Sequence, residues 1–410
     1  MNNRRWLVLL PVIFVTYSLA FLDRTNYSFG AAAGLATDLK ISQEQSSFLG
    51  ALFFLGYFAF QIPGALYAQR RSVKKLIFWG LILWGALASA TGLISDISLL
   101  YVVRFMLGVV ESAVLPALLI LSARWFTASE RATASALIIV GNPVTLLWSS
   151  ILSGYLVASF GWRGMFIAEG IPAMLWAFVW WRMVDERPAD SRWLSAAERD
   201  ALESKLAEEQ RGLAPVRDYK AAFRSPFVIA LAVQYFCWSI GVYGFVLWLP
   251  SILKAGGVDM VTLGWLTAVP YFAAIIAEIG ISRVSDRARR RRALIWPFLL
   301  VGTLAFYGSY AVGASNFWLS FVLLIVAGAA MYAPYGPFFA WIPEMLPANV
   351  SGGATALINS MGALGSFVGT YAVGHLNGLT GSPDMSYLAM AAALLVSAVI
   401  TMCLPERKPA

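Results

Sequence analysis

The sequence predicts an all-α polytopic membrane protein, with twelve transmembrane helices in two pseudo-symmetric six-helix bundles. Three observations lead to this fold class. First, 59% of the 410 residues are hydrophobic and only 13% are charged, whereas a soluble globular protein has about 25% charged residues. Second, long apolar segments recur along the chain, and one polar segment divides them into two sets of six. Third, part of the first set is repeated in the second.

Each apolar segment is long enough to cross a bilayer, because a hydrocarbon core about 30 Å thick needs about 20 mostly apolar residues in a helix. The first segment follows Arg4 and Arg5 as a signal peptide would. No small-residue cleavage site comes after it, so we expect it to be retained as a span. The predicted spans are residues 6–34, 46–67, 75–94, 98–123, 132–159, 164–183, 226–253, 261–283, 293–313, 317–345, 352–376 and 386–404.

The polar segment at residues 184–224 separates the sixth span from the seventh. Within it, Ser195 and Glu198 have the spacing of a capping box, which predicts a short helix over residues 196–210. The expected organisation is an N-terminal six-helix bundle at 1–183, a cytoplasmic linker at 184–224 and a C-terminal six-helix bundle at 225–410.

The basic residues predict the orientation of the chain. Of the 30 Lys and Arg residues, 25 lie in the termini, the linker and the loops on the linker's side, and only three lie in loops on the other side. Cytoplasmic loops of membrane proteins carry an excess of Lys and Arg. We therefore expect the cell inner (plasma) membrane as the location, with both termini cytoplasmic. The net charge of +8 is then a topology signal and not a nucleic-acid-binding patch.

An internal repeat relates the two halves. The stretch GVVESAVLPALLILSARWFTASERATASAL begins at Gly108, and GAAMYAPYGPFFAWIPEMLPANVSGGATAL begins 220 residues later at Gly328, with no gap between the two patterns. The fourth and fifth spans thus correspond to the tenth and eleventh. Parallel repeats of six spans are one transporter architecture, in which the substrate site lies near the midplane between the halves.

Four charged residues lie inside the first and fourth spans: Asp23, Arg24, Arg104 and Glu111. Charges in the bilayer are costly and usually face protein or a water-filled cavity, where they pair. Because Asp23 and Arg24 are neighbours, they cannot both point the same way. The charges predict a proton-coupled anion site in which Arg24 presents a planar fork to a carboxylate. Asp23 and Glu111 take protons, and Arg104 holds the deprotonated Asp23.

The alternative is an inert network of buried ion pairs, since such pairs also occur without a function. If buried ion pairs of this kind were needed to stabilise both halves, the same charged residues would recur in the repeat. The position that corresponds to Glu111 is Met331, however. This favours the functional interpretation, because a proton site needs only one copy.

Several motifs together resemble the major facilitator superfamily over the whole chain, and within it the anion:cation symporter family. They are FLDRTNYS, GYFAFQIPGALYAQRRSVKK, RFMLGVVESAVLPA, WFTASER, GWRGMF, SDRARRRR and ALINSMGALGSFVG. That family imports organic anions, notably sugar acids and aromatic or dicarboxylic acids, usually with protons. The resemblance points to the same four charged positions.

The resemblance also implies that tyrosines and amides in other spans bind the substrate's hydroxyl and carboxylate groups. The matching residues here are Tyr57, Gln61, Asn142, Tyr243, Tyr335 and Asn359. The alternative for each is a hydrogen bond between helices or packing at an interface. Three further titratable residues have other expected roles. We expect Glu169 to pair with Arg163, Glu278 to be a second coupling site or a partner of Arg283, and His375 to lie at the surface.

The loops after the second and eighth spans are implied to gate the cytoplasmic side. Asp286 and Arg287 keep the family's Asp-Arg pair after the eighth span. After the second span, Ala68 and Gln69 occupy those places. The gate in the N-terminal half is therefore expected to lack one charge contact.

The predicted function is secondary active transport, with import of an organic carboxylate by proton symport and alternating access. The polar set favours a sugar acid such as a hexonate or uronate; the alternatives are an aromatic or dicarboxylic acid transporter, or an anion exchanger. An enzyme is disfavoured, because the sequence has no metal cluster, nucleophile–histidine pairing or nucleotide loop. The two cysteines lie in apolar runs without a disulfide framework. We expect a monomer in the lipid bilayer with no cofactor and no metal, whose partners are the organic anion and protons.

Overall fold

The computed structural model describes residues 5–211, 223–288, 290–346, 348–381 and 384–405. Every regular element in these ranges is a helix, which confirms the predicted fold class. The N-terminal half contains η1 (Arg5–Leu9), α1 (Leu10–Thr25), α2 (Tyr27–Ala32), α3 (Leu35–Asp38), α4 (Gln43–Arg70), α5 (Val73–Leu93), α6 (Ile97–Glu111), α7 (Val114–Trp125), α8 (Ala128–Ile139) and α9 (Gly141–Met183). The linker contains η2 (Pro188–Asp190) and α10 (Ala196–Arg211). The C-terminal half contains α12 (Pro226–Lys254), α13 (Met260–Ala288), η3 (Arg292–Leu294), α14 (Trp296–Val312), η4 (Gly313–Ser315), α15 (Phe317–Tyr332), α16 (Tyr335–Met345), α17 (Ala348–Thr380) and α18 (Asp384–Cys403).

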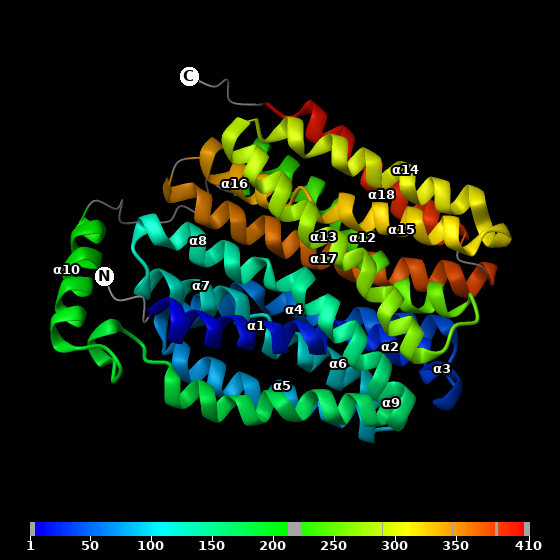
Figure 1. The fold of residues 1–410 in the computed structure, drawn as a ribbon, viewed down its shortest axis with the longest axis horizontal. Helices are drawn as coiled ribbons and strands as arrows, with labels where there is room; N and C mark the ends of the chain where they lie inside the picture. The colour runs from blue at the N-terminus through cyan, green and yellow to red at the C-terminus, as the bar shows by residue number, and fades with distance from the viewer. Residues whose placement is uncertain (1–4, 212–222, 289, 347, 382–383, 406–410) are drawn as a thin grey trace.

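Among the described residues, eleven helical segments are long and apolar enough to cross a membrane. One of them, Thr133–Met183, has 51 residues, which is enough for two crossings because a 20-residue helix spans about 30 Å. Gly161 divides it with a left-handed φ of +68°, and Figure 1 shows the chain reversing direction near the α9 label, so that the second leg returns towards the linker. The predicted fifth and sixth spans are these two legs, so the segments account for all twelve predicted spans.

The two halves lie side by side, with α10 at one end of the molecule (Figure 1). We call this end the linker side and the opposite end the loop side. Contacts between the halves join α4 to α17, α9 to α13 and α2 to α12. The first span, which carries Asp23 and Arg24, therefore reaches the interface between the halves through α2.

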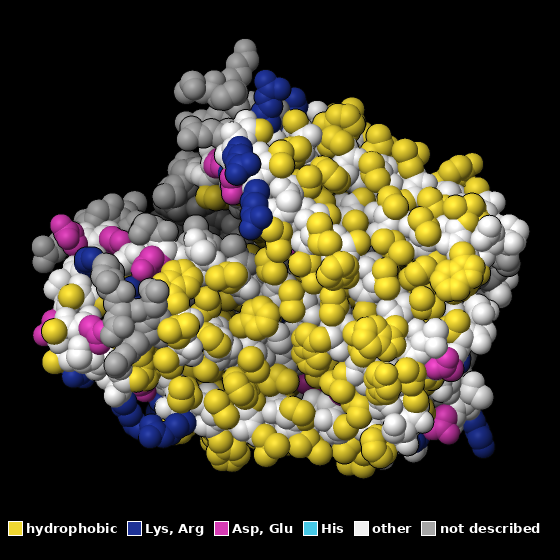
Figure 2. Space-filling view, viewed as in Figure 1, with side chains coloured by type: hydrophobic (Ala, Val, Ile, Leu, Met, Phe, Trp, Pro, Cys, Tyr) yellow, Lys and Arg dark blue, Asp and Glu magenta, His cyan; other side chains and the backbone are white. Residues whose placement is uncertain are grey.

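The exterior of the spans is apolar. Figure 2 shows hydrophobic side chains covering the middle of the visible face, with charged side chains gathered towards its two ends. Leu175, Phe178 and Trp318 expose 63%, 66% and 65% of their surface. A surface of this kind suits lipid, where helices satisfy their own backbone hydrogen bonds.

Two spans are interrupted at matching places of the repeat. The fourth span changes from α6 to α7 at Ser112 and Ala113, and the tenth changes from α15 to α16 at Ala333 and Pro334. The first span has a similar break at Asn26, directly after α1. Glu111 is the last residue of α6, and Asp23 and Arg24 lie in the last turn of α1. The helix breaks therefore lie next to the buried charges, as in transporters with discontinuous helices.

The linker helix has the predicted capping box. The Ser195 backbone N–H donates to Glu198 Oε2 at 2.9 Å, and the Glu198 N–H donates to Ser195 Oγ at 3.3 Å. The helix begins at Ala196 as expected and extends to Arg211, one residue beyond the predicted end. The local sequence is sufficient for this element because the two reciprocal bonds satisfy backbone donors that would otherwise lack partners.

Glu186 connects the start of the linker to the start of α5. Its carboxylate accepts hydrogen bonds from the backbone N–H groups of Val73 and Lys74, at 3.0 and 3.1 Å, and from the Ser72 hydroxyl at 2.9 Å. Arg124 adds an ion pair. Burial alone would raise the pKa of the Glu186 carboxyl, but these hydrogen bonds and the Arg124 charge hold that pKa below its usual value.

We expect Glu186→Gln to lower the thermal stability of the detergent-solubilised protein at pH 7. A carboxyl whose pKa falls on folding stabilises the folded state above its unfolded pKa of about 4.3, and this contribution disappears as the pH falls through the lower folded pKa. The Tm difference between wild type and variant should therefore shrink at about pH 4. A difference of equal size at both pH values would show that the charge of Glu186 is not what stabilises this junction.

Candidate functional site

A cavity of about 490 Å³ lies between the two halves. Its walls come from α1, α4, α7, α8 and α9 in one half and from α12, α16 and α17 in the other. It reaches from Arg24 to Gln69 and Ala123, which lie near the ends of α4 and α7 on the linker side. The cavity thus extends from the helix break in the first span towards the linker side.

The loop side is closed between the halves by α4 and α17. The Tyr371 hydroxyl donates to Glu44 Oε1 at 2.8 Å. The ring of Phe48 meets those of Phe367 and Tyr371, with centroids 6.4 and 6.0 Å apart. A Cβ added to Gly374 would lie only 2.0 Å from Ser47 Oγ, so the two helices are in direct contact here. The structure is therefore a state whose central cavity extends towards the linker side and whose loop side is sealed.

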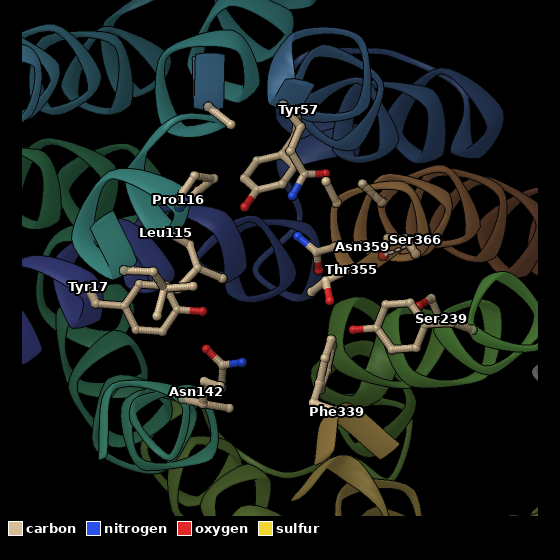
Figure 3. Close-up of a pocket in the computed structure, with 18 of the residues that line it drawn as sticks. Tyr17, Tyr57, Leu115, Pro116, Asn142, Ser239, Phe339, Thr355, Asn359 and Ser366 are labelled. Carbon is tan, nitrogen blue, oxygen red and sulfur yellow. Dashed lines mark hydrogen bonds between the residues drawn. The ribbon is translucent and has the colours of Figure 1, made fainter. Parts of the chain in front are cut away.

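All seven residues predicted to bind substrate line this cavity: Arg24, Tyr57, Gln61, Asn142, Tyr243, Tyr335 and Asn359. Figure 3 shows Tyr57, Asn142 and Asn359 directing polar atoms into the same space from three different helices. Tyr243 also contacts the other half, because its ring lies 4.8 Å from that of Phe54. The structure thus brings together side chains that are up to 335 residues apart, from Arg24 to Asn359.

The cavity is also lined by polar residues that the sequence did not single out, among them Tyr17, Tyr235, Ser239, Thr355 and Ser366. Each lies four, seven or eight positions from a predicted residue on the same helix. Tyr17 is seven before Arg24, and Ser239 is four before Tyr243. Residues at these spacings share a helix face. This spacing was the sequence signal for these residues. They would have been found by including the polar residues four, seven or eight positions from each predicted site residue.

Asp23 and Arg24 point in different directions, as predicted. Arg24 lines the cavity, whereas Asp23, Arg104 and Glu111 lie behind it and are each at most 1% exposed. Arg24 Nη2 lies 3.7 Å from Glu111 Oε2. The Arg24 guanidinium is also stacked over the ring of Tyr57, with its Cζ 4.7 Å from the centroid. Of the four charged residues, Arg24 is therefore the one that lies at the cavity, and it connects the cavity to the buried Glu111.

The predicted partnership of Arg104 with Asp23 is wrong as a direct ion pair. Asp23 Oδ1 instead accepts a hydrogen bond of 3.4 Å from the Asn26 amide, while Arg104 lies over the ring of Tyr27 at 5.0 Å. None of the three Arg104 nitrogens has a hydrogen-bond partner. The direct ion pair in this cluster joins Arg24 to Glu111. The reason is packing, because the ring of Tyr27 takes the place beside Arg104 where a carboxylate was expected.

Close contact between α4 and α6 holds Tyr57 and Glu111 near Arg24. A Cβ added to Gly108 would lie 1.9 Å from the backbone oxygen of Phe53, and one added to Gly56 would lie 2.2 Å from that of Phe105. Real Cβ atoms do not approach backbone oxygens so closely, and backbone atoms cannot rotate aside. Only glycine at these two positions allows the helices to pack at this distance.

We expect Gly108→Ala to destabilise the protein by about 1–3 kcal/mol, as overpacking of a tight core does, and to impair transport by displacing Glu111 from Arg24. The measurements are the Tm in detergent and uptake by cells. Gly280→Ala in α13 is the matched control, because an added Cβ there has no atom within 4 Å. A Gly108 variant that behaves like the Gly280 variant would contradict the close contact.

Two expectations for other buried acids are changed by the structure. Glu169 does not pair with Arg163; it is 1% exposed, and its Oε1 accepts a 2.7 Å hydrogen bond from Ser153. Arg163 instead pairs with Asp38 at 3.3 Å. Among the described residues, Glu278 has no ion pair with Arg283; it is buried, and its Oε2 lacks a hydrogen-bond partner. The helix rotations that decide these contacts are not visible in hydropathy.

His375 lies on the loop side, where its Nδ1 is 3.5 Å from Glu44 Oε1. Its imidazole stacks on the ring of Tyr371 with centroids 5.6 Å apart. The side chain is 35% exposed. This places the histidine near the surface, as expected, but at the contact between the halves.

The predicted gating pair lies at the linker-side end of α13. Asp286 Oδ1 lies 2.6 Å from Arg291 Nη1, and Arg291 also pairs with Glu344 at 2.7 Å. Arg287 is exposed. In the other half, Ala68 is completely buried where the family has an aspartate. The charge cluster of the C-terminal half thus has no carboxylate counterpart at position 68.

A family model described as Major Facilitator Superfamily matches residues 13–369 and 252–410. A protein of Agrobacterium vitis that carries the name of a tartrate transporter is 30% identical over 409 residues, covering 98% of this chain and 90% of the relative. A quinolone resistance transporter of Acinetobacter baumannii is 27% identical over 411 residues, covering 96% and 92%. The crystal structure of a D-xylose-proton symporter is similar with a TM-score of 0.78 at 15% identity, covering 97% of this chain and 98% of that chain. Identity this low shows a shared fold alone.

Proposed function

This chain belongs to the Major Facilitator Superfamily and is a membrane transporter rather than an enzyme, and from that premise we propose that it imports an organic carboxylate by proton symport. The two bundles, 1–183 and 225–410, act as the units that rock about the central cavity. The linker side is the cytoplasmic side, as the excess of Lys and Arg there indicates. On this assignment the structure is an inward-facing state of a monomer in the plasma membrane.

The observation that carries the proposal is the position of Arg24. It is the one charged side chain among the described residues that line the cavity. Arg24 is 7% exposed and its Nε has no hydrogen-bond partner. A guanidinium offers a rigid fork of donors that matches a carboxylate in a bidentate arrangement. A carboxylate that enters from the linker side therefore meets an opposite charge at Arg24.

Glu111 couples the anion to the proton in this proposal. It is completely buried, and its contact with Arg24 at 3.7 Å is too long for a hydrogen bond. When Glu111 is ionised, it competes with the substrate for the charge of Arg24. When Glu111 is protonated, Arg24 is free to bind the anion. The anion then raises the proton affinity of the cluster by the same factor, because coupling between two ligands is reciprocal.

The cavity lining favours a hydroxylated monocarboxylate, such as a hexonate or uronate. Gln61, Asn142 and Asn359 provide donors and acceptors for hydroxyl groups, and a site that hydrogen-bonds hydroxyls rejects analogues without them. Among the described lining residues, a second carboxylate would find no second cation. The relative from Agrobacterium vitis is named for tartrate, which carries hydroxyl groups but also two carboxylates, so its name supports a hydroxylated acid and keeps a dicarboxylic acid as an alternative.

An aromatic acid is the second candidate substrate. Among the described residues, seven aromatic side chains line the cavity beside the amides, namely Tyr17, Phe54, Tyr57, Tyr235, Tyr243, Tyr335 and Phe339. A ring could stack between them while its carboxylate binds Arg24. Exchange of one anion for another remains the alternative mechanism, since it needs Arg24 but no titrating carboxyl.

The test begins with a thermal-shift screen of sugar acids, aromatic acids and dicarboxylic acids on the detergent-solubilised protein. Ligands that raise the Tm are then tested for uptake into proteoliposomes under an imposed pH gradient. We expect a hydroxylated monocarboxylate to bind and to accumulate. Binding without accumulation, together with rapid counterflow, would replace symport by exchange; the absence of any organic-acid ligand would contradict the proposal.

A further inference from the structure

A second polar space lies apart from the central cavity, at the interface between the halves. It measures about 10 Å³, close to the volume that one water molecule needs. Its walls come from the first span and α9 in one half and from α12 and α13 in the other. Most of the lining is polar and includes Thr25, Asn26, Ser28, Ser149, Ser150 and Ser153. Neither Arg24 nor any residue predicted to bind substrate lines it.

Beside this space, α9 packs closely against α13. A Cβ added to Gly154 would lie 2.6 Å from the backbone oxygen of Met260 and 3.0 Å from the Cα of Gly264. These two helices belong to different halves. Rocking of the halves that opens the loop side must therefore separate α9 from α13 and expose this polar space.

Glu169 lies directly behind the polar space. Its Oε1 accepts the 2.7 Å hydrogen bond from Ser153, a residue that lines the space, and its Oε2 is buried without any hydrogen-bond partner. Among the described residues no Lys or Arg forms an ion pair with Glu169. An ionised carboxylate in such surroundings is costly, because burial of a charge requires pairing or full hydrogen bonding.

Asn26 connects Glu169 to the first charged pair. Its amide donates to Asp23 Oδ1 at 3.4 Å, and the same side chain lines the small polar space together with Ser153, the residue that is bonded to Glu169. Asp23 in turn is close enough to interact electrostatically with Glu169, Glu111 and Arg104. The carboxyls of Glu169, Asp23 and Glu111 thus form a buried series that runs from the small polar space to Arg24 at the central cavity.

We propose that Glu169 is a further proton-handling residue, which exchanges protons with the loop side through the small polar space and passes them to Asp23 through ordered water held in that space by Ser153 and Asn26. The proposal rests on the proton symport proposed above. In each transfer one carboxyl gives up a proton and another accepts it, so no net charge is created. Glu111 faces Arg24 beside the cavity that extends to the linker side, whereas Glu169 is bonded to Ser153 at the small space between α9 and α13, which widens when the loop side opens. This arrangement gives the proton a route to each side in turn.

The groups that face this series come from several elements. The first span contributes Asp23, Arg24 and Tyr27, α6 contributes Arg104 and Glu111, and α13 contributes Tyr271 across the polar space. Among the described residues, Glu169 has no direct cation partner, does not line the central cavity, and is the carboxyl of the series that is bonded to a residue lining the small polar space. Its removal should therefore affect the delivery of protons and leave anion binding intact.

The experiment compares wild type, Glu169→Gln and the matched control Asp38→Asn in proteoliposomes. Asp38 is a loop-side carboxylate that pairs with Arg163 outside the cluster, so both variants replace a carboxylate by an amide. We expect Glu169→Gln to keep the thermal shift by substrate and counterflow within about twofold of wild type. The accumulation ratio under a pH gradient of one unit should fall from up to about ten, the factor that such a gradient can supply per proton, towards unity. The pH profile of net uptake should flatten, and Glu169→Asp should restore it in part.

Several outcomes would overturn the inference while leaving the proposed symport standing. They are wild-type accumulation by Glu169→Gln, an equal loss in Asp38→Asn, and a loss of counterflow together with accumulation. If Glu169→Gln does not fold, Ser153→Ala provides the test, since it removes only the hydrogen bond to Oε1; an unchanged pH profile in that variant would overturn the inference. Failure of the wild type itself to accumulate any organic acid would instead contradict the proposed function.

Discussion

Arg24→Ala should abolish uptake of the anionic substrate while the protein still inserts and folds. Arg24 is the one charged side chain in the described part of the cavity lining, so its loss leaves the substrate carboxylate desolvated without this partner. Truncating one member of a buried charge pair costs about 2–5 kcal/mol, a loss of affinity of about 30-fold or more. Loss of the thermal shift by substrate and loss of uptake are the two measurements.

Two further variants make this result specific. Arg24→Lys keeps the charge but not the planar fork, so we expect weak binding and slow uptake. Arg192→Ala removes an exposed arginine of the linker and should behave like the wild type. Normal transport by Arg24→Ala would remove Arg24 from the anion site, and the central role given to it here would be wrong.

Glu111→Gln should abolish proton-driven accumulation and spare exchange. Glutamine cannot titrate, so Arg24 stays available to the anion at every pH and the anion no longer carries a proton with it. Substrate affinity should become independent of pH in the range where that of the wild type changes. Accumulation under a pH gradient of one unit should fall from a ratio of up to about ten towards unity, because one proton per anion supplies 1.36 kcal/mol per unit.

The measurements are thermal-shift titrations at several pH values, counterflow, and uptake under an imposed pH gradient. Glu208→Gln is the control, since it makes the same chemical change at an exposed position of α10. Accumulation that persists in Glu111→Gln would assign the coupling proton to another group. In that case Asp23 would be the next residue to test, because it was also predicted to take a proton.

The fold was largely predictable because its determinants are local. A bilayer requires about 20 apolar residues per helix, and the chain meets this requirement twelve times. The linker helix followed from Ser195 and Glu198, whose reciprocal bonds involve only four consecutive residues. The orientation proposed for the chain likewise follows from counting Lys and Arg.

The sequence predicted which residues belong to the site better than it predicted which of them contact one another. Arg24, Asn142 and Asn359 were placed in one site from their positions in the spans and from the family resemblance, and all three line the cavity. The sequence did not indicate that Arg24 would pair with Glu111, nor that Glu169 would turn away from Arg163 towards Ser153. It also did not indicate at which end the cavity would extend to the surface.

By itself the sequence determined that this protein crosses the membrane in two related sets of helices and that it carries charged residues inside the membrane spans. Hydropathy, capping and charge asymmetry depend on residues near one another in the chain, so one sequence is sufficient to read them. Only the tertiary structure decided which charges meet. Contacts such as that of Gly108 with the backbone of Phe53 set the distance and rotation of each helix, and a small rotation moves a side chain from the cavity to a neighbouring helix. For the same reason, only the packing of α4 against α17 showed that the loop side is closed.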